Sequence, residues 1–188
     1  ASEIVARQEA VVPIGDPFAD NTAMPAWVNR ELLSRQYQTD HDVARVALEI
    51  DRELRPDVMF VFFPGIDRIS HWLWGNLEPE EFYPPPLRPT PEAREAGAEA
   101  LRRYYEFTDA LIGRLLEGRD PGDLVVVISD HGFEAGVSLM LLTGEHESSA
   151  AIEGVVFARG RGIPGGIDAG RIGILDITPT ILAWLGLP

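Results

Sequence analysis

The stretch VVVISDHGF, residues 125–133, decides the fold class, because an apolar run of strand length ends in an acid, a histidine and a glycine. A second run, VMFVFF at residues 58–63, is equally apolar and leads through Pro64 and Gly65 to Asp67. Wholly apolar runs of this length are typical of strands buried on both faces, as in a parallel sheet covered by helices. We therefore predict two buried strands with polar, chemistry-bearing residues at their carboxyl ends.

Helical patterns lie on both sides of these two runs. Apolar residues recur at steps of three and four from Pro25 to Leu54, and an interruption at Thr39–Asp42 fits either two helices or one long helix with a break. Further elements are expected at Pro91–Glu117 and Asp176–Leu185 as helices and at Glu153–Ala158 as a strand. Strands that alternate with long helices predict an α/β fold, with a largely parallel sheet flanked by helices on both faces.

Residues 75–91 interrupt this alternation. They are rich in proline and acidic residues, which argues against regular structure and predicts a surface insertion. At its end, Thr90 has the side chain of a helix N-cap, and Pro91 fits the first helical position.

Composition excludes some classes of protein. A chain of 188 residues can form one domain with a sizeable core. It has no cysteine, so thiolate metal sites and disulfides are excluded, and its apolar runs are too short to span a bilayer. The formal net charge of -14 disfavours binding to a nucleic-acid backbone but allows a small phosphorylated substrate, because bound dications invert the local potential.

Candidate metal ligands gather where ligands bind in open α/β sheets, beyond the carboxyl ends of strands. Asp67 and His71 are four residues apart, so a helical turn would point both side chains the same way. Asp130 and His131 follow the other strand, and His146 stands in the later sequence GEH. Each residue alone has an ordinary explanation, as a core histidine, a turn cap or an exposed loop residue. Their joint occurrence favours a metal site.

Three motifs, in order, resemble the alkaline-phosphatase superfamily. VVVISDHGF is similar to its SDHG motif, and DRISHWLW resembles the Asp-x-x-x-His motif of type I phosphodiesterases and nucleotide pyrophosphatases. The order GEH, GVVFARGRGI and ILDITPTILAWLGLP is similar to the C-terminal block of that family. The resemblance covers roughly residues 45–188 and implies an alkaline-phosphatase-like α/β fold.

The resemblance implies a role for each matching residue. Asp67, His71 and His146 match the ligands of one metal ion, and Asp130 and His131 match two ligands of a second ion. In the family, the second site is completed by an aspartate that ends an N-terminal strand and by a Thr or Ser nucleophile. The run AVVPIGDPFADNT lacks the length and pattern of that region. We therefore expect residues 1–188 to be the C-terminal part of one catalytic domain, an incomplete fold whose nucleophile lies outside this chain.

The implied function is a metal-dependent phosphoric ester hydrolase of the phosphodiesterase or nucleotide pyrophosphatase type, acting on a small phosphorylated substrate. Mixed Asp and His ligands suit two zinc ions best, and manganese or iron would also fit. Without its nucleophile, this chain alone is expected to be inactive. The alternatives are a sulfatase or a phosphomutase of the same superfamily, or a truncated, non-catalytic metal-binding domain.

Three residues beside the expected ligands are candidates for substrate binding. Arg68 could reach a phosphate or form an outward salt bridge, and Trp72 and Trp74 could stack on a substrate or pack a loop. The sequence leaves both interpretations of each residue open.

Overall fold

The computed structural model describes residues 33–138 and 141–188. The chain divides into two compact units, Ala1–Glu117 with Phe133–Glu145, and Gly118–Gly132 with His146–Pro188. Two parts of the sequence analysis lie outside the described residues. They are the run AVVPIGDPFADNT, which contains Asp16 and Thr22, and the start of the helical pattern at Pro25.

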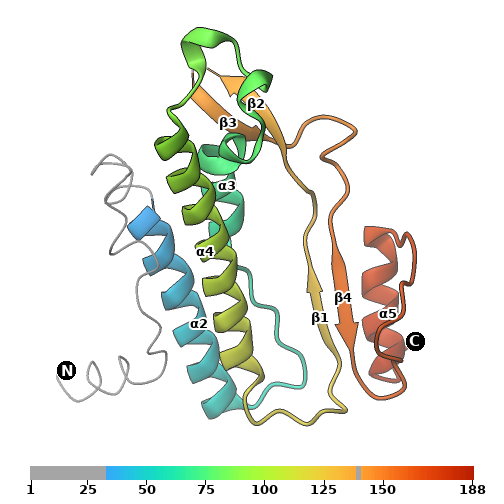
Figure 1. Ribbon diagram of the computed structural model, residues 1–188. Helices are drawn as coiled ribbons and strands as arrows, with labels where there is room; N and C mark the ends of the chain where they lie inside the picture. Colours follow the sequence, from blue (N-terminus) through green and yellow to red (C-terminus); the bar gives the residue numbers. More distant parts are fainter. Residues whose placement is uncertain (1–32, 139–140) are drawn as a thin grey trace, which may run out of the picture. The chain divides into compact units, whose positions relative to one another are not determined.

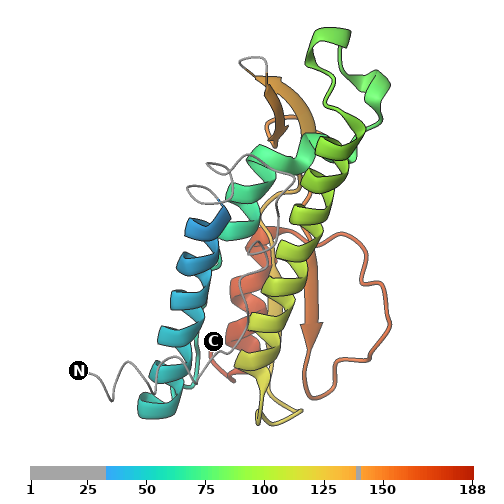
Figure 2. The ribbon, with the colours of Figure 1, turned by 60° about the vertical axis from the view of Figure 1, so that its left-hand side comes forward.

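Helices form the core of the first unit. Helix α2 (Ser34–Leu54) and helix α4 (Pro91–Leu116) run side by side, and the short helix α3 (Gly65–Leu73) packs against both (Figures 1 and 2). The largest core residues come from all three helices and the residue before α2: Leu33, Tyr37, Ile69, Leu73, Leu101, Tyr104, Phe107 and Leu111. This core is what holds α3 in place.

Helix α2 is continuous through Thr39–Asp42, so the described part of this pattern forms one helix, without the break that the sequence analysis expected there. The Thr39 hydroxyl donates to the Arg35 carbonyl at 2.9 Å, so this polar side chain bonds back to its own helix. The helix ends at Arg55, which takes a left-handed conformation with φ 46° and donates its N–H to the Asp51 carbonyl. Pro56 follows and cannot continue the helix.

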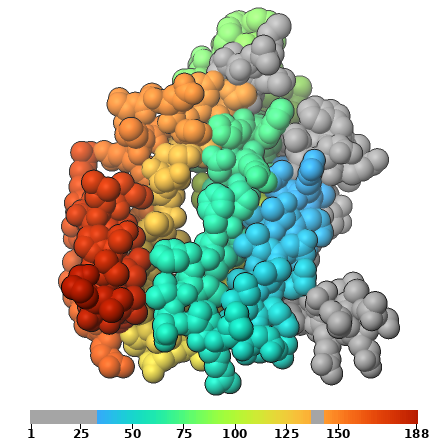
Figure 3. Space-filling view, turned by 180° about the vertical axis from the view of Figure 1, so that it is seen from behind, coloured from blue at the N-terminus to red at the C-terminus, as the bar shows by residue number. Residues whose placement is uncertain are grey.

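The predicted strand at residues 58–63 is wrong. This segment is not part of any sheet among the described residues, and the side chains of Phe60 and Phe62 are 80% and 78% exposed. Met59–Phe62 and the face of α2 around Val46 and Ile50 line an apolar groove of about 550 Å³. In Figure 3 the segment lies at the surface beside α2. An apolar run alone does not supply the neighbouring strands that a ladder requires.

The insertion at residues 75–91 contains only short 3-10 turns before α4, as its composition predicts. Its anchor is Tyr83, which is 2% exposed and donates its hydroxyl to the Gly75 carbonyl at 3.0 Å. The Thr90 hydroxyl accepts from the Ala93 N–H at 3.2 Å, and Pro91 begins the helix, so the predicted N-cap is confirmed.

The first unit is completed by a hairpin of strand β2 (Glu134–Ser138) and strand β3 (Leu141–Glu145), which pair antiparallel with Glu134 opposite Glu145. Strand β3 packs on α3 at Gly144. A Cβ atom there would overlap the Ser70 carbonyl and lie 2.7 Å from the Trp74 Cβ, so only glycine allows this approach.

The second unit contains strand β1 (Val125–Ile128), strand β4 (Val156–Arg159) and helix α5 (Ile177–Trp184) (Figure 1). The predicted strands at both positions and the closing helix are confirmed within a few residues. Strands β1 and β4 pair antiparallel, with Val125 opposite Arg159 and Ile128 opposite Val156.

The predicted parallel sheet is wrong for the described residues, which form two separate two-stranded antiparallel sheets. The direction of a strand's partner is set by non-local pairing, and the apolar pattern of a single strand does not contain it. Across the same residues, no helix is both long and apolar enough to cross a membrane.

Candidate metal centre

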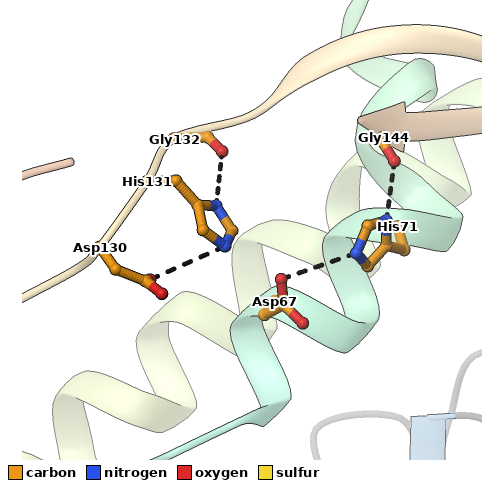
Figure 4. Close-up of polar contacts among 6 residues, drawn as sticks. All are labelled: Asp67, His71, Asp130, His131, Gly132 and Gly144. Atoms are coloured by element: carbon orange, nitrogen blue, oxygen red, sulfur yellow. Dashed lines mark hydrogen bonds and ion pairs between the residues drawn. The ribbon is translucent and has the colours of Figure 1, made fainter. Parts of the chain in front are cut away.

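Helix α3 carries the first pair of predicted ligands. It begins directly after Pro64 and Gly65, with Asp67 in its first turn, where a carboxylate is favoured by the helix dipole. His71 lies one turn later, and its Nε2 is 3.7 Å from the Asp67 Oδ1 (Figure 4). The predicted i, i+4 convergence is confirmed. Both side chains are about two-fifths exposed and so are open to a ligand from solvent.

The opposite nitrogen of His71 is held by the hairpin. Its Nδ1 lies 2.9 Å from the Gly144 carbonyl oxygen, which can only accept, so Nδ1 carries the proton in the neutral ring (Figure 4). Nε2 then carries the lone pair that a metal ion needs. This arrangement, in which a backbone carbonyl fixes the tautomer of a histidine, is the usual support for a histidine ligand.

The His71 ring, which faces Asp67 at Nε2 and Gly144 at Nδ1, also contacts the ring of Phe133. The two ring centroids are 5.2 Å apart at an interplanar angle of 81°, an edge-to-face contact. The same Phe133 ring lies 5.5 Å from Trp74. The aromatic contacts and the hydrogen bond to Gly144 restrict the rotamers of His71 before any ligand arrives.

The second pair of predicted ligands follows strand β1 in the second unit. Asp130 Oδ1 and His131 Nε2 are 3.7 Å apart, while His131 Nδ1 lies 2.9 Å from the carbonyl oxygen of the next residue, Gly132 (Figure 4). Asp130 is 81% exposed and His131 is 21% exposed.

The turn that carries this pair is fixed by hydrogen bonds within the second unit. The Gly132 N–H donates to the Ala151 carbonyl at 2.7 Å, and the Ser129 N–H donates to the Val155 carbonyl at 3.0 Å. The Ser129 hydroxyl accepts from the Val155 N–H at 2.9 Å. A Cβ at position 132 would lie 2.9 Å from the Glu153 carbonyl, so the close turn favours glycine.

His146 belongs to the same unit as His131. Their imidazole rings stack, with centroids 3.9 Å apart and an interplanar angle of 18°. The structure thus brings together two of the histidines that the sequence singled out, and it places the fourth histidine, His41, on α2 beside Tyr37.

The candidates for substrate binding have contacts of their own. Arg68 donates from Nη1 to the Gln36 Oε1 at 3.0 Å, and Trp74 packs against the helical core. Trp72 is 41% exposed. Their role in substrate binding stays a prediction.

Sequence reasoning missed a fully buried carboxylate, Asp40, beneath the start of α3. Its Oδ2 accepts from the Gly65 N–H at 3.1 Å and from the Tyr104 hydroxyl at 2.9 Å. Burial raises the pKa of Asp40 to about 6, against the lowering effects of these two hydrogen bonds and the Arg68 charge. The sequence contained a signal: Asp40 occupies a position in the apolar stripe of α2, between Tyr37 and Ala44.

Comparison with known proteins supports the motif-based resemblance. Residues 5–143 match the family model described as Type I phosphodiesterase / nucleotide pyrophosphatase. The matched range contains both Asp–His pairs and ends before His146. No curated protein and no solved structure matches the chain.

Proposed function

Because the chain belongs to the type I phosphodiesterase / nucleotide pyrophosphatase family, we propose that it contributes the metal ligands of a phosphoric ester hydrolase. The observation that carries this proposal is the Asp67–His71 pair. Its carboxylate and imidazole face each other on one helix, and the Gly144 carbonyl fixes the histidine tautomer that a metal requires.

The first proposed ligand set is Asp67, His71 and His146. These three side chains each offer one ligand atom. Chain connectivity supports including His146, because it directly follows strand β3, whose Gly144 carbonyl holds His71. One carboxylate and two imidazoles form a donor set that suits zinc, and manganese or iron would also be accepted.

The second proposed ligand set contains Asp130 and His131, whose arrangement repeats that of the first pair. When bound, two dications would supply Lewis-acid stabilisation of charge on the phosphoryl oxygens and on the attacking and leaving oxygens. The protein's part is to hold the ligand atoms in position before binding. For a chain with a net charge of -14, the ions would also offset the repulsion of an anionic substrate.

The proposal is tested first by metal binding. Zinc affinity is measured by competition with a chromophoric chelator for the unmodified chain and for His71→Ala and Asp67→Asn. The matched control is His41→Ala, since His41 is the one histidine outside the family motifs. We expect both ligand variants to lose zinc affinity and the control to keep it. Equal affinity in all four proteins would contradict the proposed site.

Hydrolysis is tested on the full-length protein loaded with zinc or manganese. Bis-aryl phosphate, mono-aryl phosphate and aryl sulfate are compared, and we expect the phosphodiester to be hydrolysed fastest. Preference for the sulfate would favour a sulfatase. Tight zinc binding without hydrolysis of any of the three would favour the non-catalytic metal-binding domain.

A further inference from the structure

Asp40 is a buried carboxylate in the first unit that has no part in the proposed function. Its side chain is 0% exposed, in a core of leucine and aromatic residues. A carboxylate is rarely buried so completely, because it loses its hydration unless hydrogen bonds replace it. Packing alone therefore does not explain an aspartate at this position.

The hydrogen bonds of Asp40 join three helices. Asp40 comes from α2, and its Oδ2 accepts from the Tyr104 hydroxyl of α4 and from the Gly65 N–H, the first amide of α3. Burial raises the pKa of Tyr104, so its hydroxyl stays protonated and remains a donor. One carboxylate oxygen thus links the start of α3 to both long helices.

Within the described part of the chain, the start of α3 has no other side-chain cap. Pro64 occupies the N-cap position and makes no capping hydrogen bond, so the Gly65 amide finds its partner in Asp40. A negative charge at this end of a helix is also favoured by the helix dipole.

The approach of α3 to this carboxylate is close. A Cβ atom at Gly65 would overlap both the Tyr104 hydroxyl and the Asp40 Oδ2. The helix can therefore sit on the pair only because residue 65 is glycine. Its position is set by direct backbone contact with the pair, with no intervening side chain.

We propose that Asp40 is a positioning residue, which fixes the first turn of α3 and thereby the orientation of the metal ligands Asp67 and His71. The inference rests on the proposed function of that pair. The path is short, because Asp67 lies two residues beyond the anchored amide and His71 one turn further along the same nine-residue helix.

The test compares Asp40→Ala with Asp40→Asn. Alanine leaves the Gly65 amide and the Tyr104 hydroxyl without their acceptor, while asparagine retains one accepting oxygen. Leu111→Val is the control for lost stability, because Leu111 is fully buried in the same core, two turns after Tyr104 in α4. All variants are first shown to be folded by circular dichroism.

Zinc affinity is the first measurement. We expect Asp40→Ala to bind zinc about tenfold more weakly, the usual lower limit for loss of a supporting residue. Asp40→Asn should restore most of that loss, and Leu111→Val should bind as the unmodified chain does. The inference is overturned if folded Asp40→Ala binds zinc normally, or if affinity follows stability across all three variants.

The ring nitrogens of His71 give a second measurement that needs no metal. In Asp40→Ala, the 15N chemical shifts of His71 should change because the helix moves relative to the Gly144 carbonyl, while Leu111→Val should leave them unchanged. If the unmodified chain binds no zinc, the proposed function fails, and these shifts still decide the role of Asp40. Unchanged shifts in Asp40→Ala would overturn the inference.

Discussion

The two Asp–His pairs have the same internal distance but different support. In both, the histidine Nε2 lies 3.7 Å from the aspartate Oδ1. His71 Nδ1 is held by Gly144, 73 residues away in the sequence, whereas His131 Nδ1 meets the carbonyl of its neighbour Gly132. The acceptor of the His71 ring nitrogen therefore comes from a distant segment, whereas that of His131 is the next residue, although the turn that carries the β1 pair is itself bonded to Ala151 and Val155.

Exposure also differs between the two pairs, in opposite directions for the aspartate and the histidine. Asp67 and His71 are exposed to a similar extent, at 43% and 41%, while Asp130 is 81% exposed and His131 21%. A ligand pair whose rotamers are already restricted loses less conformational entropy when it binds an ion. We infer that the α3 pair is the better prepared of the two for metal binding.

The largest expected effect compares the two histidines directly. His71→Ala should lower the affinity for the first zinc ion by more than about 100-fold, since removing a ligand costs more than removing its support. His131→Ala should leave that affinity within about tenfold and weaken the second ion. Titration calorimetry with zinc measures both affinities. If the two variants lost the high-affinity zinc site to the same extent, the inferred difference between the two pairs would be contradicted.

The next effect concerns the support beneath α3. Because burial raises the pKa of Asp40 to about 6, above its ordinary value, the protonated form is favoured in the folded state. The stability that the raised pKa of Asp40 contributes is fully present below about pH 4, and it is lost as the pH rises through about 6 and the carboxyl group ionises. Asp40→Asn lacks this titration, so its free energy of unfolding should improve relative to the unmodified chain by at most about 3 kcal/mol between pH 4 and pH 7.

Urea denaturation at several pH values measures that difference. Trp72 and Trp74 are fluorescent probes in the first unit. If the difference in the free energy of unfolding between Asp40→Asn and the unmodified chain stayed constant across this pH range, the raised pKa of Asp40 would be contradicted.

Gly144→Ala tests the close approach of the hairpin to α3. The added methyl would meet the Ser70 carbonyl and Trp74, and overpacking of this kind costs about 2 kcal/mol. It should also weaken zinc binding, since it moves the carbonyl that holds His71. The control is Gly113→Ala in α4, where a Cβ atom meets nothing within 4 Å and should stabilise the helix by up to about 1 kcal/mol. If Gly144→Ala changed neither stability nor zinc affinity, the hairpin would not support His71 as inferred.

The sequence was sufficient for the parts of the site that depend on local geometry. The i, i+4 spacing predicted that Asp67 and His71 converge, and the two side chains do face each other. Helix α4 and its Thr90 cap were equally predictable, because helix periodicity and capping are local properties.

The features that the sequence did not reveal depend on non-local contacts. Strand pairing is one example, since residues 58–63 are as apolar as β1 yet belong to no sheet in the described part of the chain. The acceptor of His71 and the partners of Asp40 come from segments at least 25 residues away. Spacing within a motif carries no information about such partners.

The smallest expected effect is in the second unit. Ser129→Ala removes the hydroxyl that accepts from the Val155 N–H at the start of the turn bearing Asp130 and His131. An exposed hydrogen bond of this kind contributes about 1 kcal/mol or less, because water replaces the lost partner. We expect a small loss of stability in the second unit, followed by the fluorescence of Trp184, and no change in the 15N shifts of His71. If the loss is instead as large as that of Gly144→Ala, the turn after β1 is supported as strongly as the packing of the hairpin on α3, and the inferred difference between the two pairs would be contradicted.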